Sequence, residues 1–456
     1  MKIYIRDTAQ KKKVEFKPLD ENNVRLYVCG PTIYDNIHLG NTRPQIIFDT
    51  LFRTLKHFYP TTYVKNVTDV DDKIIKRANE EGISTNELVD KFYNIYKRDL
   101  EKINVLPASV EPRATDHIQE MIAIIEQLIK NGHAYATEDG NVLFSVETYQ
   151  DYGKLSHRKV EDLLAGERIA IEEYKKSPAD FILWKPAKEG EPYWESPWGN
   201  GRPGWHIECS AMSSKYLGKT FDIHAGGNDL LFPHHENEVA QSVCCNGKGS
   251  FAQYWMHNGM LNVNGEKMSK SLGNFFTLNE ILEKYHGEVV RFYFLSTHYH
   301  QPMNWTDDGL EIAKKTLDKI YNALLSTKDI HIDKLAKPRE DFLEALCDDL
   351  NTPKAISILH EMTTELNKNP NEKIKSELLA SADLLGILKA DPEKWFTGLE
   401  SDNSISEDEI NKLVQERTDA KKNKDYQLAD DIRNKLDKDF GIILEDKPEG
   451  TIWKKK

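Results

Sequence analysis

The strongest constraint on the fold is a strand–turn–helix–strand succession close to the N-terminus. Residues 24–28 alternate in the manner of a β-strand and run into a Cys-Gly-Pro turn. Residues 44–58 place apolar side chains on one face of a predicted helix, and residues 61–67 have the composition of a second strand. This succession is typical of the start of a nucleotide-binding α/β sheet.

The length and the pattern along the chain predict several domains. A chain of 456 residues is too long for one hydrophobic core. Irregular sequence with Gly, Pro and Trp indicates an insertion between two halves of the sheet, and later sequence is helical and highly charged. The expected divisions are 1–112 and 201–258 for the two halves of a Rossmann-like catalytic domain, 113–200 for the connective insertion, 259–310 for a region with a lysine-rich motif, 311–400 for a helical bundle, and 405–456 for a small C-terminal domain.

The composition excludes some classes of protein and leaves others open. The formal net charge of -13 argues against indiscriminate binding of nucleic acid, although local patches can still bind RNA. Five cysteines, odd in number and widely scattered, fit reduced thiols in a cytosol better than a disulfide framework. The N-terminus lacks a signal-peptide pattern, and no run of about eighteen apolar residues predicts a membrane span. We therefore expect a cytoplasmic protein with no membrane contact.

Two short segments carry side chains suited to a polyphosphate. His38 and Gly40 lie between the first strand and the first helix, where helix N–H groups face an anion. His38 can donate to phosphate oxygens, and Gly40 leaves room for a flat base. The second segment, residues 267–271 with the sequence KMSKS, supplies two lysines and two hydroxyls. Taken singly, His38 fits a helix cap and the lysines fit a solvated loop, so the combination carries the prediction.

A metal site is a further candidate. His234 and Glu238 are four residues apart on a helix predicted to begin at Pro233, so their side chains face the same way. With Cys29 and Cys209 they would form a mixed sulfur, nitrogen and oxygen site suited to zinc. The His and Glu between them in sequence are expected to face away. Spacing alone leaves open that the thiols are small buried apolar groups and the His/Glu pair a solvated helix face.

Longer strings place these residues in a family context. His38-Leu39-Gly40-Asn41 and the KMSKS segment resemble the HIGH and KMSKS signatures of class I aminoacyl-tRNA synthetases, with Asn41 in place of the last His. The strings YVCGPTIYD, TDVDDKIIKRA, GWHIECSAM and FDIHAGGNDLLFPHHENEVAQS resemble cysteinyl-tRNA synthetases. The resemblance implies an α/β Rossmann-like catalytic domain with an insertion, followed by a helical bundle and a small C-terminal anticodon-binding domain.

The resemblance also implies a reaction and a set of site residues. The carboxylate of L-cysteine attacks the α-phosphorus of ATP, which binds with Mg²⁺, and the cysteinyl group is then transferred to tRNA(Cys). We expect a monomer in which residues 259–310 contact the tRNA stem. The implied residues are His38, Asn41, Lys267 and Lys270 for catalysis; Thr32, His38, Gly40, Asn41 and Lys270 for ATP; Thr68, Trp205, His206 and Asp229 for the amino acid; Cys29, Cys209, His234 and Glu238 for zinc; and Arg433, Asp446 and Trp453 for tRNA.

Zinc suits the selection that such an enzyme must make. An apolar pocket discriminates poorly between cysteine and serine, whereas a thiolate is a far better zinc ligand than a hydroxyl. A cysteine ligase on the same fold that joins cysteine to a sugar amine would keep both signatures but would not need residues 405–456. A zinc hydrolase would leave KMSKS unexplained, and a catalytically dead RNA-binding relative would not need His38, Lys270 or the zinc ligands. The sequence therefore favours the tRNA synthetase.

Overall fold

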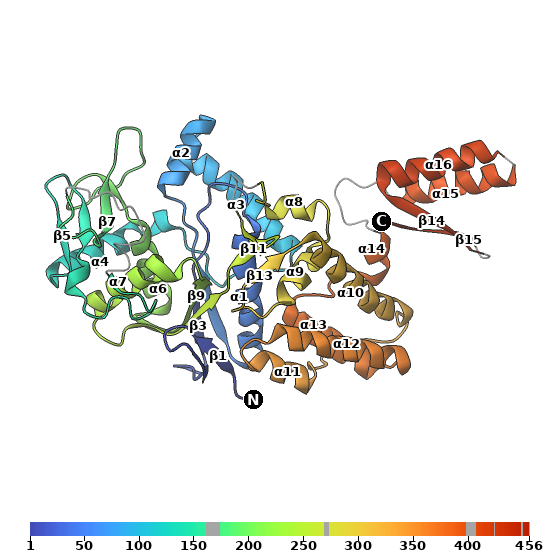
Figure 1. Ribbon diagram of the computed structural model, residues 1–456, viewed down its shortest axis with the longest axis horizontal. Helices are drawn as coiled ribbons and strands as arrows, with labels where there is room; N and C mark the ends of the chain where they lie inside the picture. Colours follow the sequence, from blue (N-terminus) through green and yellow to red (C-terminus); the bar gives the residue numbers. More distant parts are fainter. Residues whose placement is uncertain (161–173, 269–272, 398–406, 424, 448–449, 456) are drawn as a thin grey trace. The chain divides into compact units, whose positions relative to one another are not determined.

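The computed structural model describes residues 1–160, 174–268, 273–397, 407–423, 425–447 and 450–455 (Figure 1). Lys270, one of the predicted catalytic residues, lies outside these ranges. The chain forms two compact units: unit 1 is Met1–Ala313, Pro338–Leu359 and Leu384–Ile387, and unit 2 is Lys314–Lys337, His360–Asp383 and Leu388–Lys456. In the part of the chain that the structure describes, no helix is both long enough and apolar enough to cross a lipid bilayer.

A sheet of four parallel strands forms the centre of unit 1, in the order β10-β9-β3-β4. Its strands are β3 (Val24–Val28), β4 (Thr61–Lys65), β9 (Thr220–Gly227) and β10 (Phe251–Asn258). Helix α1 (Leu39–Phe58) packs on one face and α6 (Trp205–Leu217) on the other (Figure 1). Because helices cover both faces, the strand residues are mostly apolar and buried. The fold class predicted from the sequence, α/β with a central parallel sheet, is confirmed.

Helix boundaries follow capping residues more closely than apolar periodicity. Helix α1 begins at Leu39, five residues before the predicted start, because the side chain of His38 accepts the N–H of Asn41 and caps the first turn. That first turn is polar, so the apolar pattern does not mark it. Helix α2 (Asp72–Glu81) ends, as predicted, at Gly82, whose φ of 68° is left-handed. Helix α3 (Thr85–Lys102) follows it.

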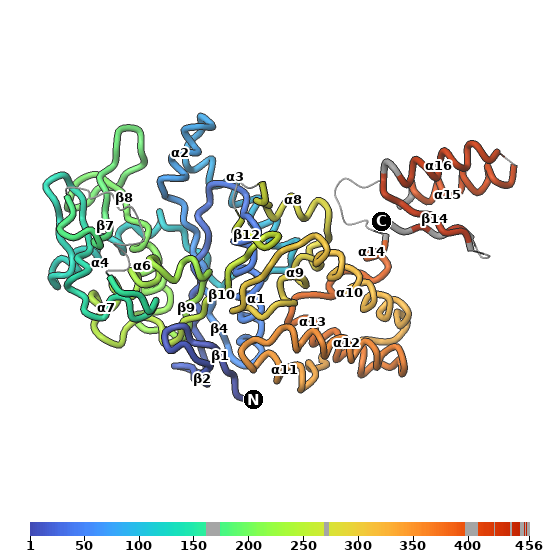
Figure 2. The backbone as a smooth tube through the Cα atoms, viewed as in Figure 1, coloured from blue at the N-terminus to red at the C-terminus, as the bar shows by residue number. Residues whose placement is uncertain are grey.

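The insertion has a sheet of its own. Figure 2 traces the chain from α3 into this segment and back into the central sheet at β9. Its elements are η1 (Ala114–His117), α4 (Ile118–Lys130), β5 (Ala134–Ala136), β6 (Val142–Phe144), η2 (Val146–Thr148), β7 (Phe181–Pro186) and β8 (Gly201–Pro203). The four strands pair antiparallel in chain order. The segment is more regular than its sequence indicates, because three of its four strands have only three residues and are too short to show an alternating pattern.

The second half of the sheet leads to the KMSKS region. A turn, η3 (Leu231–His235), precedes α7 (Glu236–Asn246), so the regular helix begins three residues later than the predicted start at Pro233. Phe232 inside the turn has non-helical backbone angles.

A small sheet of order β12-β11-β13 follows. The remaining elements of unit 1 include β1 (Tyr4–Asp7), β2 (Lys12–Glu15), β11 (Leu261–Val263), β12 (Glu266–Lys267), α8 (Leu278–Leu282), α9 (Gly287–Leu295), β13 (Met303–Trp305) and α11 (Glu340–Cys347).

The rest of the chain is predominantly helical, as its charged, periodic sequence predicts. Its helices are α10 (Asp307–Ser326), α12 (Thr352–Lys368), α13 (Glu372–Leu385), α14 (Pro392–Thr397), α15 (Glu407–Lys422) and α16 (Tyr426–Phe440). A hairpin of β14 (Ile442–Lys447) and β15 (Gly450–Lys455) ends the chain. Helices α15 and α16 and this hairpin share an apolar core of Ile410, Ile432, Leu436, Ile442 and Leu444.

Candidate active site and metal centre

Four buried donor atoms converge beside the central sheet. Cys29 follows the end of β3, Cys209 lies on α6, His234 lies in η3 and Glu238 lies on α7. The Sγ atom of Cys29 is 3.5 Å from Cys209 Sγ, 3.7 Å from His234 Nε2 and 3.5 Å from Glu238 Oε1. His234 Nε2 is 3.0 Å from Glu238 Oε1. The structure thus brings together all four residues that the sequence assigns to zinc.

The four donors fit a tetrahedral zinc ion. Zinc bonds of about 2.3 Å to sulfur and about 2.0–2.1 Å to nitrogen or oxygen place neighbouring ligand atoms roughly 3.3–3.8 Å apart. The distances above agree with this range or lie just below it. The mixed set of thiol, imidazole and carboxylate is also one that zinc accepts. The residues present therefore fit the metal that the resemblance implies.

Hydrogen bonds and charge favour the metal-binding protonation states of two donors. Although burial opposes ionisation, the thiol of Cys29 donates to Cys209, and this bond together with the charge on His234 lowers the pKa of Cys209 to about 6. Burial also opposes the charge on Glu238, but His224 and His234 lower its pKa to about 2. Thiolate and carboxylate are the forms in which these side chains bind metals.

Histidines around the four donors hold them in position. His206 Nδ1 lies 2.9 Å from His234 Nδ1, and the indole of Trp205 stacks on the His234 ring at 4.3 Å between centroids. The other oxygen of Glu238 lies 2.8 Å from His224 Nε2. Such contacts fix the orientation of metal ligands. His224 is not among the residues predicted from the sequence, although a histidine inside the buried strand β9 is a signal that could have identified it.

The sequence predicts that His235 and Glu236 both face away from the four donors, but only Glu236 does so. Glu236 does face away, because its two oxygens accept the N–H groups of Gly153 and Ser156 at 2.8 and 2.7 Å. His235 Nδ1 lies 2.8 Å from His257, but its Nε2 is buried without a hydrogen-bond partner, 3.9 Å from Glu238. His235 and His224 therefore form, with Cys29 and Glu238, a second possible donor group that overlaps the first.

The first signature lies at the N-terminus of α1. His38 Nδ1 accepts the backbone N–H of Asn41 at 3.2 Å, so a neutral ring carries its proton on Nε2. A Cβ atom at Gly40 would lie 2.9 Å from this ring, so a side chain there would displace the His38 ring. Thr32 forms an isolated parallel bridge with Thr68, next to the same strand ends.

The second signature approaches the first. Lys267 is exposed at the end of β12. Met268, the next residue, has its Cε atom 3.4 Å from the position that a Cβ at Gly40 would occupy. On the far side of the KMSKS segment, the N–H of Leu39 donates to the carbonyl of Phe276 at 3.1 Å. Met268, at the start of the KMSKS segment, and Phe276, beyond its end, therefore both lie against residues 38–40.

Of the four residues predicted to bind the amino-acid substrate, two contact one of the metal-donor candidates and two do not. Trp205 and His206 contact His234, as described above. The hydroxyl of Thr68 donates to the buried carboxyl of Glu208 at 2.9 Å, and burial raises the pKa of Glu208 well above its usual range. Asp229 is exposed just beyond the carboxyl end of β9, where its carboxylate lies over Gly227. Sequence reasoning missed Glu208, because an acidic residue on a helix usually faces solvent.

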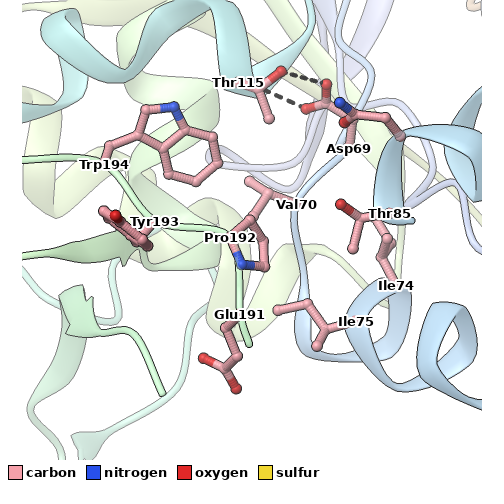
Figure 3. A pocket seen from close by; sticks show the side chains of 11 residues that line it. Asp69, Val70, Ile74, Ile75, Thr85, Thr115, Glu191, Pro192, Tyr193 and Trp194 are labelled. Carbon is pink, nitrogen blue, oxygen red and sulfur yellow. Dashed lines mark hydrogen bonds between the residues drawn. The ribbon is translucent and has the colours of Figure 1, made fainter. Parts of the chain in front are cut away.

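A cavity of about 360 Å³ opens beyond Thr68, between the 69–86 segment and the insertion (Figure 3). On one side Asp69 accepts the N–H and hydroxyl of Thr115 at 3.0 and 2.6 Å. Tyr193 and Trp194 form the opposite wall, and a smaller hollow that includes Trp205 shares the lining residue Val70. The two hollows therefore adjoin each other at Val70, and the smaller one reaches Trp205, which stacks on His234.

The predicted tRNA-binding residues lie on α16 and the C-terminal hairpin. Arg433 is exposed on α16. The carboxylate of Asp446 accepts hydrogen bonds from Arg417 at 2.9 and 3.0 Å, from Lys421 at 2.6 Å and from the hydroxyl of Thr451 at 2.7 Å. Trp453 Nε1 donates to Asn411 at 3.0 Å. Asp446 and Trp453 therefore have structural partners within the domain, whereas Arg433 is presented to solvent.

Comparisons with known proteins agree with this architecture. The family described as tRNA synthetases class I (C) catalytic domain matches residues 15–315, and the DALR domain family matches residues 341–391. The fold is similar to that of Mycobacterium tuberculosis methionyl-tRNA synthetase, with a TM-score of 0.58 and 14% identity over 80% of this chain and 89% of that one. Fold and family together define a class I aminoacyl-tRNA synthetase.

Curated relatives narrow the class. Cysteine–tRNA ligase of Rhodospirillum rubrum (strain ATCC 11170) is 50% identical over 100% of both chains. Cysteine–tRNA ligase of Actinobacillus pleuropneumoniae serotype 5b is 47% identical over the same shares. The chain therefore belongs to the cysteine–tRNA ligase family. It is a ligase whose substrates are ATP, cysteine and tRNA.

Proposed function

We propose that this ligase selects L-cysteine at a zinc ion held by Cys29, Cys209, His234 and Glu238. The observation that carries the proposal is the convergence of these four buried donors, whose ligand atoms all lie within 4.8 Å of one another. When bound there, zinc accepts a thiolate far more readily than a hydroxyl as a further ligand, which separates cysteine from serine.

The amino-acid pocket supports this selection. Trp205 lies against His234 and is 39% exposed, so part of its indole can form a wall beside the substrate. Asp229 carries a negative charge that suits the substrate ammonium group. Thr68 and His206 complete the pocket, with Thr68 held by Glu208 and His206 held against His234. These contacts exclude water from the donors and fix their geometry.

Adenylate formation is proposed at the N-terminus of α1. The substrate carboxylate is already ionised, so its attack on the α-phosphorus of ATP needs no general base. Negative charge develops on the departing pyrophosphate, which Mg²⁺ accompanies. His38 donates from Nε2, and the ammonium groups of Lys267 and Lys270 stabilise this charge; a single well-placed donor contributes roughly 3 kcal/mol in other enzymes.

The other ATP contacts come from the same segment. Thr32 and Asn41 supply polar groups beside His38. Gly40 allows the flat base to approach the backbone, because a side chain there would meet the His38 ring at 2.9 Å.

The later part of the chain is proposed to bind tRNA(Cys). Arg433, Asp446 and Trp453 supply the charged and aromatic groups that recognise unpaired bases. Of the three, Arg433 is the best placed, since it is exposed. The corresponding division of labour is residues 1–112 and 201–258 for catalysis, 113–200 as the connective insertion, 259–310 for contact with the tRNA stem, 311–400 as a helical bundle and 405–456 for the anticodon. The monomeric state and the cytoplasmic location remain predictions.

The test is ATP–pyrophosphate exchange with cysteine and with serine, before and after complete zinc removal, followed by tRNA charging. We expect exchange with cysteine alone, loss of exchange without zinc, and recovery on adding zinc. Exchange that proceeds equally with serine, or that persists without zinc, would contradict the proposal. Charging of tRNA(Cys), with no transfer of cysteine to a sugar amine, separates the tRNA ligase from the alternative ligase on the same fold.

A further inference from the structure

Helix α1 buries an arginine that no carboxylate of the described residues neutralises. Arg43, two residues after Asn41, is completely buried. Its Nη1 donates to the carbonyls of Gly259 and Met260 at 2.7 and 3.1 Å. Its Nη2 donates to the carbonyls of Gln301 and His298 at 2.8 and 3.4 Å. Arg43 forms no ion pair with any residue that the structure describes, and burial lowers its pKa to about 10.

Burying the charged guanidinium of Arg43 is energetically costly. Removing a guanidinium from water without an opposite charge costs several kcal/mol, which backbone carbonyls offset only in part. Arg291 on α9 provides a contrast within the same unit. It is equally buried and donates to the carbonyls of Ile103, Asn104 and Leu385, but it also pairs with Asp49. The special feature of Arg43 is the set of backbone segments that it joins.

Those segments flank the strand pair that leads to Lys267. Gly259 and Met260 connect β10 to β11, and β11 pairs with β12, which ends at Lys267. His298 and Gln301 precede β13, which pairs with the other edge of β11. Arg43 therefore links α1 to both of the backbone segments that lead into this small sheet.

A second attachment lies on the far side of the KMSKS segment. The N–H of Leu278 donates to the carbonyl of Ile37 at 2.8 Å, and the Phe275 ring lies 5.2 Å from the His38 ring. Residues 37–39 thus hold the segment that follows KMSKS, and Arg43 holds the segment that precedes it. The two attachments together determine how far Lys267 lies from His38.

We propose that Arg43 is a positioning residue for adenylate formation: by holding the Gly259–Met260 turn and the 298–301 loop on α1, it sets Lys267 in register with His38. The proposal rests on the proposed roles of His38 and Lys267 in binding ATP. Arg43 does not touch ATP. Its effect is on the geometry of the polyphosphate site, and not on the metal centre.

The experiment is cysteine-dependent ATP–pyrophosphate exchange by the full-length, zinc-loaded variants Arg43→Gln and Arg43→Lys. A misplacement of about 1 Å can reduce a rate about 100-fold. We expect kcat/KM for ATP to fall roughly 10- to 100-fold in Arg43→Gln, with KM for cysteine and zinc content unchanged. Arg43→Lys should recover part of this loss, because an ammonium donates to some of the four carbonyls but cannot bridge both segments.

Arg291→Lys is the matched control, since it disturbs an equally buried arginine with carbonyl partners. It should lower the melting temperature without changing KM for ATP. If Arg43→Gln does not fold, Gly259→Ala disturbs the same contact from the other side, because a Cβ there would lie 2.3 Å from the carbonyl oxygen of Gln301. That variant should give the same ATP-specific defect.

Two results would overturn the inference. One is Arg43 variants that lose only stability, with an unchanged KM and kcat for ATP in the folded fraction. The other is an equal ATP defect in Arg291→Lys. Failure of zinc-dependent cysteine selection in the wild-type enzyme would instead contradict the proposed function, and that measurement is separate from the ATP dependence.

Discussion

Cys209 and Cys29 are 180 residues apart in sequence, yet their sulfur atoms lie 3.5 Å apart. The position of the donors also depends on neighbouring residues that are not themselves donors. His206 and Trp205 contact the His234 ring. The hydroxyl of Thr68 donates to the carboxyl of Glu208, the residue before Cys209 on α6. At this scale the site is a set of oriented donors in a dry environment, which is what a tight and selective metal site requires.

The first prediction concerns the sulfur ligand Cys209. Cys209→Ser replaces a soft donor with a hydroxyl, so bound zinc should fall well below about one ion per chain. Cysteine-dependent ATP–pyrophosphate exchange should fall with it. Zinc content by mass spectrometry and the exchange rate, measured on the same preparation, check both expectations.

The matched control is Cys244→Ser, because Cys244 is another buried thiol on α7 but belongs to neither donor group. It should retain zinc and exchange activity. A Cys209→Ser protein that folds and keeps a full complement of zinc would show that the other donors suffice.

Helix α1 links several elements through buried charge. Asp49 on this helix is completely buried and accepts from Arg53 at 2.8 Å, from the N–H of Leu106 at 2.8 Å and from Arg291 on α9. The helix thus carries the proposed ATP-binding segment at its N-terminus and a charge cluster in its middle. The cluster fixes α1 against α9 while Arg43 fixes it against the β11 segments.

The second prediction follows from that cluster. Asp49→Asn leaves two arginines without their carboxylate, one of them completely buried, and removing one partner of a buried ion pair typically costs about 3–5 kcal/mol. We expect a correspondingly lower midpoint in urea unfolding. Glu15→Gln, which breaks the exposed Lys2–Glu15 pair, should leave the midpoint nearly unchanged. Equal effects of the two substitutions would contradict this view.

The third prediction concerns the C-terminal hairpin. Hydrogen bonds from Arg417, Lys421 and Thr451 hold the pKa of Asp446 well below its usual range. A carboxyl with a depressed pKa contributes stability above its unfolded pKa of about 4, and that contribution is lost as the pH falls toward the folded pKa. Asp446→Asn should therefore weaken hydrogen-exchange protection of β14 and β15 at pH 7. The difference from the wild type should narrow as the pH falls below about 4.

A difference that stays constant with pH would mean that Asp446 acts through its shape and not through its charge. The contribution is modest, because the Asp446 side chain is 48% exposed.

On the scale of the whole molecule, catalysis and tRNA binding are assigned to separate parts of the chain. The parallel sheet, the described start of the KMSKS segment and the four donors all lie within residues 1–313. Helices α15 and α16 and the last hairpin have an apolar core of their own. Such a part can be removed without opening the core of the sheet.

The fourth prediction is that a chain ending at Thr397 keeps cysteine-dependent ATP–pyrophosphate exchange near the full-length level but charges tRNA(Cys) poorly. The reason is that exchange needs only ATP, cysteine and the metal, whereas charging also needs the tRNA to be oriented. Exchange and charging assays on the two chains check it. Arg433→Ala in the full-length enzyme is the point variant, and normal charging by the shortened chain would contradict the anticodon assignment.

The sequence by itself determined the α/β fold class and predicted the four residues that the structure brings together as possible metal donors. Local rules suffice for the strand 24–28 and for the end of α2 at Gly82, because alternation and a left-handed glycine are properties of short segments. The donors Cys29, Cys209, His234 and Glu238 came from long strings similar to a known family, since their spacing alone left other roles open.

Only the tertiary structure decided which polar side chains are buried and what they hold. The start of α1 at Leu39 depends on the cap by His38, and the roles of His224 and Glu208 depend on contacts with distant residues. Arg43 looks in sequence like an ordinary helical arginine. Its four carbonyl partners lie more than 200 residues away, and no local pattern encodes a contact whose energy comes from segments brought together by folding.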